Sequence, residues 1–309
     1  MITILKTLPT GLMTLTEPTL GSWINVINPT PDEIEQLAAL GISKDYLTYP
    51  LDVDERARTE RENGEMLILL RVPYYQGDEA DIPYNTLPLG IILTPTHVVT
   101  VCKRPIEILD SLTSGKVRDL STAKFIRVVL HILLKTAEHY LSDVREINKK
   151  VDILEDRLQM STRNRELLAL LKYQKSLTIF TTSLKSNELM MERLQRGQLF
   201  RQYPEDEDLL EDVLTENQQA IEMTNIAANI LSAMMDAFAS LISNNLNVVM
   251  KLLASITIVV SLPTMVSSFY GMNIHLPLQD HPYSFVLVMG ATILITLAAV
   301  WIFVKRDLF

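Results

Sequence analysis

Cysteine is almost absent from this sequence, with one residue, Cys102, in 309. A single cysteine excludes a disulfide within one chain and is typical of a reducing compartment. Cys102 lies in a strand-like run, so we interpret it as a small buried apolar residue and not as a reactive thiol. Residues 1–20 have neither a basic start nor a continuous apolar core, so we expect no signal peptide.

Positive charge is also in short supply. Lys and Arg number 28 against 37 Asp and Glu, and the net charge of −9 argues against nucleic acid as a partner while being compatible with the attraction of cations. The sequence has no phosphate-binding glycine loop and no evident nucleophile with an ordered base. His131 and the pair Glu138-His139 lack the four-residue spacing of a helical zinc site. We therefore expect neither an enzyme nor an organic cofactor.

Short runs rich in β-branched residues and bounded by Gly, Pro or Asn occur in the first third of the chain, and they predict strands. These runs are residues 2–5, 23–27, 66–72, 87–93 and 97–101. Between them, Thr30 and Pro31 are followed by acidic residues, which predicts the N-terminus of a helix. The predicted fold class is α+β, in which residues 1–120 form an α/β cytosolic domain.

Strand patterns cease after residue 120, and apolar residues then recur at steps of three and four. This pattern covers residues 122–158 and 164–194, with a break at residues 161–163. It predicts two long antiparallel helices joined by a short turn, within a segment that spans residues 121–204.

A third helical pattern begins after Pro204 and meets no Pro or Gly before Pro263. Residues 205–270 number 66, which corresponds to a helix of roughly 100 Å at 1.5 Å per residue. One small domain cannot cover so long a helix, so we expect it to pack on copies of itself. Its first part, residues 205–251, is predicted to be a stalk.

Two long uncharged runs close the chain, 18 residues over 252–269 and 22 over 283–304. Each is long enough to cross a hydrocarbon core of about 30 Å. Lys251 precedes the first run and Lys305-Arg306 ends the second, whereas residues 274–282 contain no Lys or Arg. The positive-inside rule then predicts a cell membrane protein, inner or plasma, with both termini cytoplasmic and the linker outside. The predicted segments are the spans 252–270 and 283–304, the outer loop 271–282 and the basic tail 305–309.

Polar and small residues follow one stripe along the predicted first span, at alternating steps of three and four. The stripe consists of Asn247, Met250, Ala254, Thr257, Ser261, Thr264 and Ser268. One alternative is that the hydroxyls bond to their own helix and only tolerate lipid. Because the remaining positions are apolar, we favour a stripe that faces water, and one stripe can enclose water only if several copies ring an axis.

The tetrapeptide Tyr270-Gly271-Met272-Asn273 at the end of the first span, with Asn247 and Met250-Lys251 at its entrance, resembles the CorA family of divalent-cation channels. The resemblance implies a homopentameric funnel that conducts Mg²⁺, and often Co²⁺ or Ni²⁺, with Gly271, Met272 and Asn273 as the outer selectivity filter. Alignment to the family implies a pore lined at Asn247, Leu253, Ser261, Thr264 and Asn273. Leu253 lies one residue off the stripe and rests on the resemblance alone.

Asn273 suits a hydrated ion by its chemistry. Mg²⁺ sheds water reluctantly, so a ring of neutral amides could bind its water shell without stripping it. Carboxylates could hold the ion too tightly for conduction. In the linker, Asp280 is the only acid, and we expect it to attract cations at the outer mouth. The linker histidines His275 and His281 are interpreted as surface residues.

Seven acids lie between Glu205 and Glu216, where the third helix begins. We interpret the first four, residues 205–208, as a solvated acidic N-terminus favoured by the helix dipole. By the resemblance, Asp212 matches the family's regulatory metal site between neighbouring subunits, and Asp236 matches a second acidic position. Mg²⁺ is therefore expected both as the transported ion and as an inner regulator.

Two other functions remain open at the level of sequence. One is a Zn²⁺ transporter of the same fold, a branch that carries Ile in place of Met272. The other is a membrane-anchored coiled-coil scaffold, which would have no need for Asn273. The partners expected in every case are further copies of the chain and the lipid bilayer.

Overall fold

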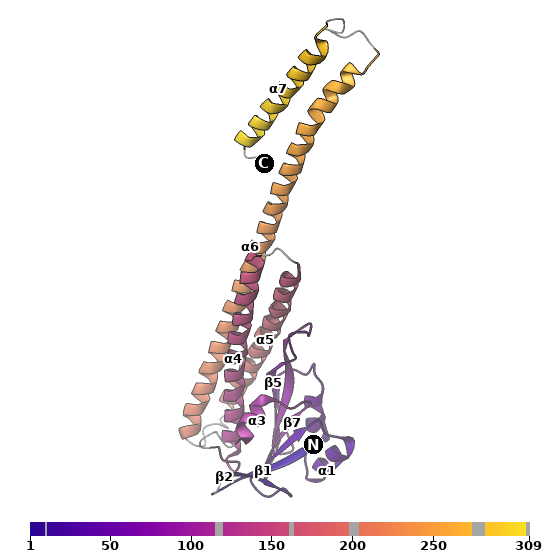
Figure 1. Cartoon of the computed structure of the whole chain (residues 1–309). Coiled ribbons are helices and arrows are strands. Elements are labelled where there is room, and N and C mark those ends of the chain that lie inside the picture. The colour runs from indigo at the N-terminus through magenta and orange to yellow at the C-terminus, as the bar shows by residue number, and fades with distance from the viewer. Residues whose placement is uncertain (10, 115–119, 161–163, 198–203, 274–281, 307–309) are drawn as a thin grey trace. The chain divides into compact units, whose positions relative to one another are not determined.

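The computed structural model describes residues 1–9, 11–114, 120–160, 164–197, 204–273 and 282–306. The chain divides into two compact units, Met1–Ala233 and Met234–Phe309. The helix α6 (Pro204–Tyr270) contributes residues to both units (Figure 1).

A seven-stranded sheet forms the base of the first unit, in the order β2-β1-β3-β7-β6-β5-β4. Its strands are β1 (Ile2–Leu8), β2 (Gly11–Leu15), β3 (Ser22–Ile27), β4 (Arg58–Glu62), β5 (Glu65–Tyr75), β6 (Tyr84–Leu93) and β7 (His97–Cys102). Only the pair β3 and β7 is parallel, with Trp23 opposite Val98, and the other pairs are antiparallel. The five predicted strands are confirmed, and the two edge strands β2 and β4 were not predicted.

Helices cover both faces of the sheet, because alternate residues of its inner strands are apolar on both sides. Leu67 and Leu69 of β5 pack with α1 (Pro31–Ala39) and α2 (Lys44–Thr48). The alternate residues Ile68 and Leu70 belong to the larger core. That core includes α3 (Glu107–Thr113), α4 (Phe125–Met160), α5 (Asn164–Arg196) and the start of α6. The predicted α/β domain with long helices is therefore confirmed.

The start of α1 has the structure that its sequence predicts. The side chain of Thr30 accepts a hydrogen bond from the backbone N–H of Glu33 at 3.3 Å, and Glu33 accepts one from the N–H of Thr30 at 2.9 Å. This reciprocal capping box satisfies two N–H groups that the helix leaves without partners.

Close packing on the sheet explains two small residues. A Cβ built on Gly90 of β6 would lie 2.2 Å from Cγ of Pro50 in η1 (Tyr49–Leu51), so only glycine fits beneath this proline. Cys102 is buried, and its thiol donates to the carbonyl of Pro88. This burial confirms the interpretation of Cys102 as an apolar core residue, and it raises the pKa of the thiol to about 11.

The long helices lie close to where the sequence predicts them. α4 and α5 run side by side along one face of the sheet (Figure 1). α6 is helical throughout from Pro204 to Tyr270, including Pro263 within it. Leu210 and Val213 of its first turns are buried in the core of the first unit.

Candidate ion-conducting site

The second unit consists of the later part of α6 and the helix α7 (Ser284–Lys305). Both helices are long and apolar enough to cross a membrane. Large apolar side chains such as Val260, Met265, Phe285 and Leu294 are exposed on the single chain. Apolar surface of this extent marks a membrane or protein interface, because water contact with it is unfavourable. The two predicted apolar helices are therefore present.

Hydroxyl residues on α6 donate their protons back into the helix. Thr257 donates to the carbonyl of Leu253 at 2.8 Å, and Thr264 donates to that of Val260 at 3.2 Å. Ser261 donates to the carbonyl of Ile258 at 2.9 Å. The hydrogen bonds therefore follow the alternative in which the hydroxyls bond to their own helix. The three side chains are nevertheless exposed on the single chain.

The same face of α6 has a shallow hollow of about 630 Å³. It is lined by Ile256, Thr257, Val260, Ser261, Thr264, Met265 and Ser268. The structure thus brings together four of the predicted pore residues, namely the hydroxyl residues. Asn247 and Leu253 lie on the exposed surface of α6 outside this hollow.

The predicted filter residues follow the last turn of α6. The N–H of Gly271 donates to the carbonyl of Ser267 at 2.9 Å, and that of Met272 donates to Phe269 at 3.2 Å, which satisfies two carbonyls at the helix end. Gly271 does not have a positive φ, so its backbone conformation does not itself require glycine. Met272 and Asn273 are exposed. Asp280, His275 and His281 lie outside the described residues.

Asp212 and Asp236 are both exposed on α6. Within the described ranges, no group of three or more His, Cys, Asp or Glu side chains is arranged to hold a metal ion. Asp212 adjoins the buried Val213, so its own side of α6 is turned away from the core. Among the residues that the structure describes, no further His, Cys, Asp or Glu side chains complete a metal site at Asp212.

The interpretation of residues 205–208 as a solvated run is wrong for Asp206. Asp206 is 1% exposed and Arg127 of α4 is 8% exposed. Arg127 donates through Nε to Asp206 Oδ1 at 2.9 Å, and through Nη2 to Glu205 Oε2 at 2.7 Å. The hydrogen bond to Glu205 helps to hold the pKa of Arg127 above its ordinary value. This buried pair ties the first turn of α6 to α4, and an isolated Arg in an apolar run was its only sequence signal.

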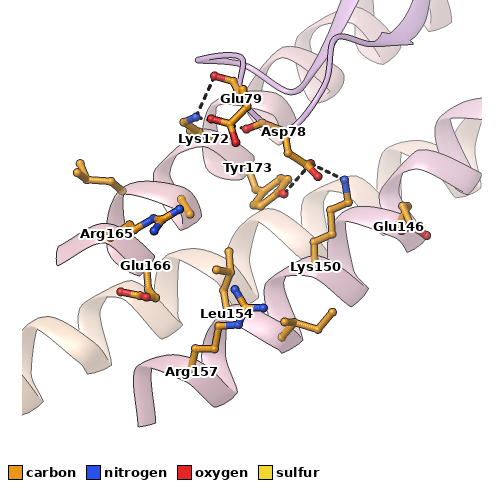
Figure 2. Close-up of a pocket in the computed structure, with 13 residues that line it drawn as sticks. Asp78, Glu79, Glu146, Lys150, Leu154, Arg157, Arg165, Glu166, Lys172 and Tyr173 are labelled. Atoms are coloured by element: carbon orange, nitrogen blue, oxygen red, sulfur yellow. Dashed lines mark hydrogen bonds and ion pairs between the residues drawn. The ribbon is translucent and has the colours of Figure 1, made fainter. Parts of the chain in front are cut away.

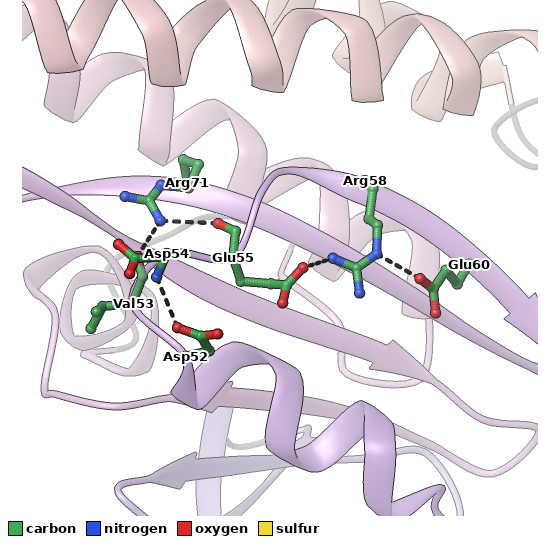
Figure 3. Close-up of polar contacts among 7 residues, drawn as sticks. All are labelled: Asp52, Val53, Asp54, Glu55, Arg58, Glu60 and Arg71. Atoms are coloured by element: carbon green, nitrogen blue, oxygen red, sulfur yellow. Dashed lines mark hydrogen bonds and ion pairs between the residues drawn. The ribbon is translucent and has the colours of Figure 1, made fainter.

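A second arginine that the sequence analysis missed organises the segment between η1 and β4 (Figure 3). Arg71 of β5 donates through Nη1 to the carbonyls of Val53 at 2.6 Å and Glu55 at 3.0 Å. Its Nη2 donates to the carbonyl of Thr86 at 2.9 Å. Glu55 in turn pairs with Arg58. The guanidinium of Arg71 thus donates hydrogen bonds to backbone carbonyls of a segment that is not paired in the sheet, and so holds that segment in place.

Asn187 of α5 fixes the backbone of Arg71 from the other side. Its Oδ1 accepts from the Arg71 N–H at 2.9 Å, its Nδ2 donates to the Arg71 carbonyl at 2.8 Å, and the hydroxyl of Tyr140 donates to the same carbonyl at 3.0 Å. These contacts join α4 and α5 to the sheet through one strand residue.

Two helices able to span a membrane, one with a hydroxyl-lined face, accompany an α/β domain, and this combination agrees with a membrane transport protein. The sequence profile described as CorA-like Mg²⁺ transporter protein matches residues 21–306. The chain therefore belongs to the CorA-like Mg²⁺ transporter family, as the resemblance implied.

Curated relatives match along nearly the whole chain. The cobalt/magnesium transport protein CorA of Methanocaldococcus jannaschii is 28% identical over 292 residues, which cover 91% of this chain and 89% of that protein. The magnesium transport protein CorA of Helicobacter pylori is 24% identical, with 92% and 89% covered. The complete structure of the CorA magnesium transporter from M. jannaschii matches with a TM-score of 0.85 at 27% identity, covering 98% of this chain and 97% of that one.

Proposed function

We propose that several copies of this chain ring an axis in the cell membrane and conduct Mg²⁺ inward, with Co²⁺ or Ni²⁺ as further substrates. The observation that carries the proposal is the family match over residues 21–306, joined to a likeness of the full chain to a CorA magnesium transporter structure. Residues 252–270 of α6 would line the pore, residues 283–304 would form the outer span, and the pentamer is taken from the family resemblance.

The path would follow the exposed polar face of α6. Thr257, Ser261, Thr264 and Ser268 already line one hollow on the single chain. Asn247 and Leu253 would face the axis nearer the cytoplasm, and Asn273 with Gly271 and Met272 would form the outer filter. Neutral amides suit an ion that retains its waters, since Mg²⁺ dehydrates reluctantly.

The membrane potential alone supplies the driving force in this proposal. A divalent ion gains about 4.6 kcal/mol on crossing 100 mV, twice the roughly 2.3 kcal/mol of one unit charge. Since about 1.4 kcal/mol corresponds to tenfold in concentration, an open pore would accumulate Mg²⁺ more than about a thousandfold. Such accumulation requires closure from inside, and we assign that role to Mg²⁺ held by Asp212, with Asp236 as a second acidic position.

The test is ion flux through the purified protein in lipid vesicles under an imposed membrane potential. We expect Mg²⁺ uptake by the native chain and its loss in Asn273→Ala, with oligomer assembly unchanged by size. Asn245→Ala is the matched control, because Asn245 is an exposed α6 residue about 200° around the helix from Asn247. It should conduct as the native chain does.

Three results would contradict this proposal. Normal flux in Asn273→Ala would exclude Asn273 as part of a selectivity filter. Absence of Mg²⁺ flux through the native protein would favour the membrane-anchored scaffold. Preference for Zn²⁺ in direct competition would assign the chain to the zinc-transporting alternative.

A further inference from the structure

A cavity of about 660 Å³ lies in the first unit, where the tip of the β5–β6 hairpin meets the later turns of α4 and the first turns of α5 (Figure 2). Its volume falls within the range of roughly 300–1,000 Å³ typical of small-molecule sites. None of its lining residues belongs to α6 or α7, so the proposed ion path does not use it.

One wall of the cavity is a fixed set of charged contacts. Lys150 of α4 donates to Asp78 Oδ1 at 2.5 Å, and the hydroxyl of Tyr173 donates to the same oxygen at 3.2 Å. Lys172 of α5 donates to the backbone carbonyls of Asp78 and Glu79. The hydrogen bond from Lys150 holds the pKa of Asp78 below its ordinary value. These contacts fix the hairpin tip against both helices, so the cavity is formed before any ligand binds.

Two arginines face this cavity from different helices. Among the residues that the structure describes, neither Arg157 of α4 nor Arg165 of α5 has an ion pair or a hydrogen bond, and both guanidinium groups point toward the space between the helices (Figure 2). Single exposed arginines are ordinary on a helix surface. Here two arginines converge on one preformed cavity, and neither forms an ion pair with Glu79 or Glu166 of the same lining. Their guanidinium groups therefore present pairs of donors suited to a phosphate.

The rest of the lining suits the organic part of such a ligand. Oε2 of Glu166 is buried and accepts no hydrogen bond within the described part of the chain. A carboxylate beside a phosphate site can accept from sugar hydroxyls, as acidic residues do from ribose in dinucleotide-binding folds. Leu154, Leu168 and Ala169 add apolar surface against which a sugar or base can pack.

We propose that this cavity binds a phosphorylated sugar or a nucleotide, with Arg157 and Arg165 on the phosphate and Glu166 on a sugar hydroxyl. The proposal is independent of the transport function, because no residue of the site lies on the predicted ion path or at Asp212 or Asp236.

Isothermal titration of the full chain in detergent with four probes tests the proposal. AMP and ribose 5-phosphate share the phosphate and hydroxyls, whereas adenosine and inorganic phosphate each lack one part. We expect the two esters to bind and the two partial probes to bind at least about tenfold more weakly, given the usual strength of charge-assisted hydrogen bonds. Tighter binding of AMP assigns a nucleotide, and equal binding assigns a sugar phosphate.

Variants locate the binding. Arg157→Gln and Arg165→Gln should each weaken ester binding by roughly ten- to a hundredfold. Glu166→Gln should weaken ribose 5-phosphate and leave inorganic phosphate unchanged. The matched controls are Arg145→Gln on α4 and Arg193→Gln on α5, which are exposed and do not line the cavity.

The controls should bind as the native chain does, and every variant should keep the native unfolding temperature. Failure of all four probes to bind at millimolar concentrations would overturn the proposal. Equal losses in the control variants would do so as well, because they would reveal a general response to surface charge. Ion flux in the same variants is expected to be native, which separates a failure here from a failure of the transport proposal.

Discussion

Arg127 shows how much depends on a single residue in the first unit. Its guanidinium and the carboxylate of Asp206 are both withdrawn from water and are compensated mainly by each other and by Glu205. The sequence displayed the anomaly, an Arg within the run Phe125–Leu134. The sequence could not identify Asp206 as the partner of Arg127, because Asp206 lies 79 positions away within a run of acidic residues that look alike in the sequence.

Replacing Arg127 by Met should destabilise the chain by about 3–5 kcal/mol, since it leaves the Asp206 carboxylate buried without its counter-charge. Thermal unfolding in detergent measures the loss. The double variant Arg127→Met/Asp206→Leu removes both charges and should recover most of it. If Arg127→Met alone is as stable as the native chain, water must reach the carboxylate of Asp206.

Asp143 of α4 is expected to make the stability of the folded chain depend on pH between about 4 and 7. Burial raises the pKa of Asp143 to about 7, and the carboxylates of Glu107 and Glu146 add to the effect. Its ordinary value is 3.8, so between about pH 4 and pH 7 the folded state holds a proton that the unfolded state does not. Stability due to this group is therefore present at low pH and is lost as the pH rises through 7.

Asp143→Asn should stabilise the chain by about 2–4 kcal/mol at pH 8 and by little at pH 4. Denaturant unfolding of both proteins across this range checks it. Asp152→Asn, an exposed residue on the same helix, is the control and should leave the profile unchanged. Parallel profiles for native and Asp143→Asn proteins would contradict the assignment.

Among the elements, periodicity predicted the long helices and the inner strands but not the two edges of the sheet. Inner strands such as β6 are apolar on both faces and are visible as β-branched runs. Edge strands lack that signal: β4 reads Arg-Thr-Glu-Arg-Glu, and its place beside β5 comes from backbone pairing. β2 has no buried residue, so its pattern could not be distinguished from a loop.

The crossing of η1 over β6 yields a test at this scale. Gly90→Ala should destabilise the chain by about 1–3 kcal/mol, because the added methyl group meets Pro50 and something must shift. Adding Pro50→Ala removes the nearest atom and should restore part of the loss in thermal unfolding. If Gly90→Ala alone leaves the unfolding temperature unchanged, η1 must shift away from β6 more easily than its packing implies.

For the whole molecule, the sequence predicted the membrane helices because hydropathy over a long run is a local property. In the proposed assembly, the pore depends on other copies of the chain. Each α6 would supply one wall of it, so the sequence pattern could indicate a polar face of α6 but not which residues face it from another copy. Membership of the CorA-like family was predictable because the resemblance rested on Gly271, Met272 and Asn273 directly after the first of two long apolar runs.

Asp212 is the residue at which regulation of the whole assembly can be tested. If Asp212 holds the closing ion, as proposed, Asp212→Ala should keep conducting at internal Mg²⁺ concentrations that stop flux through the native protein, because that carboxylate is gone. Flux against internal Mg²⁺ is the measurement. Glu211→Ala, an exposed neighbour about 100° around the helix, is the control. An unchanged dependence in Asp212→Ala would place the sensor elsewhere.

The hydroxyls that donate into α6 carry one more consequence. Once Thr257, Ser261 and Thr264 have given their protons to carbonyls of their own helix, their oxygens present only lone pairs outward. A wall of lone pairs accepts hydrogen bonds from the water shell of a cation and offers nothing to an anion such as chloride. Discrimination by the sign of charge can therefore arise along α6 without a single charged side chain.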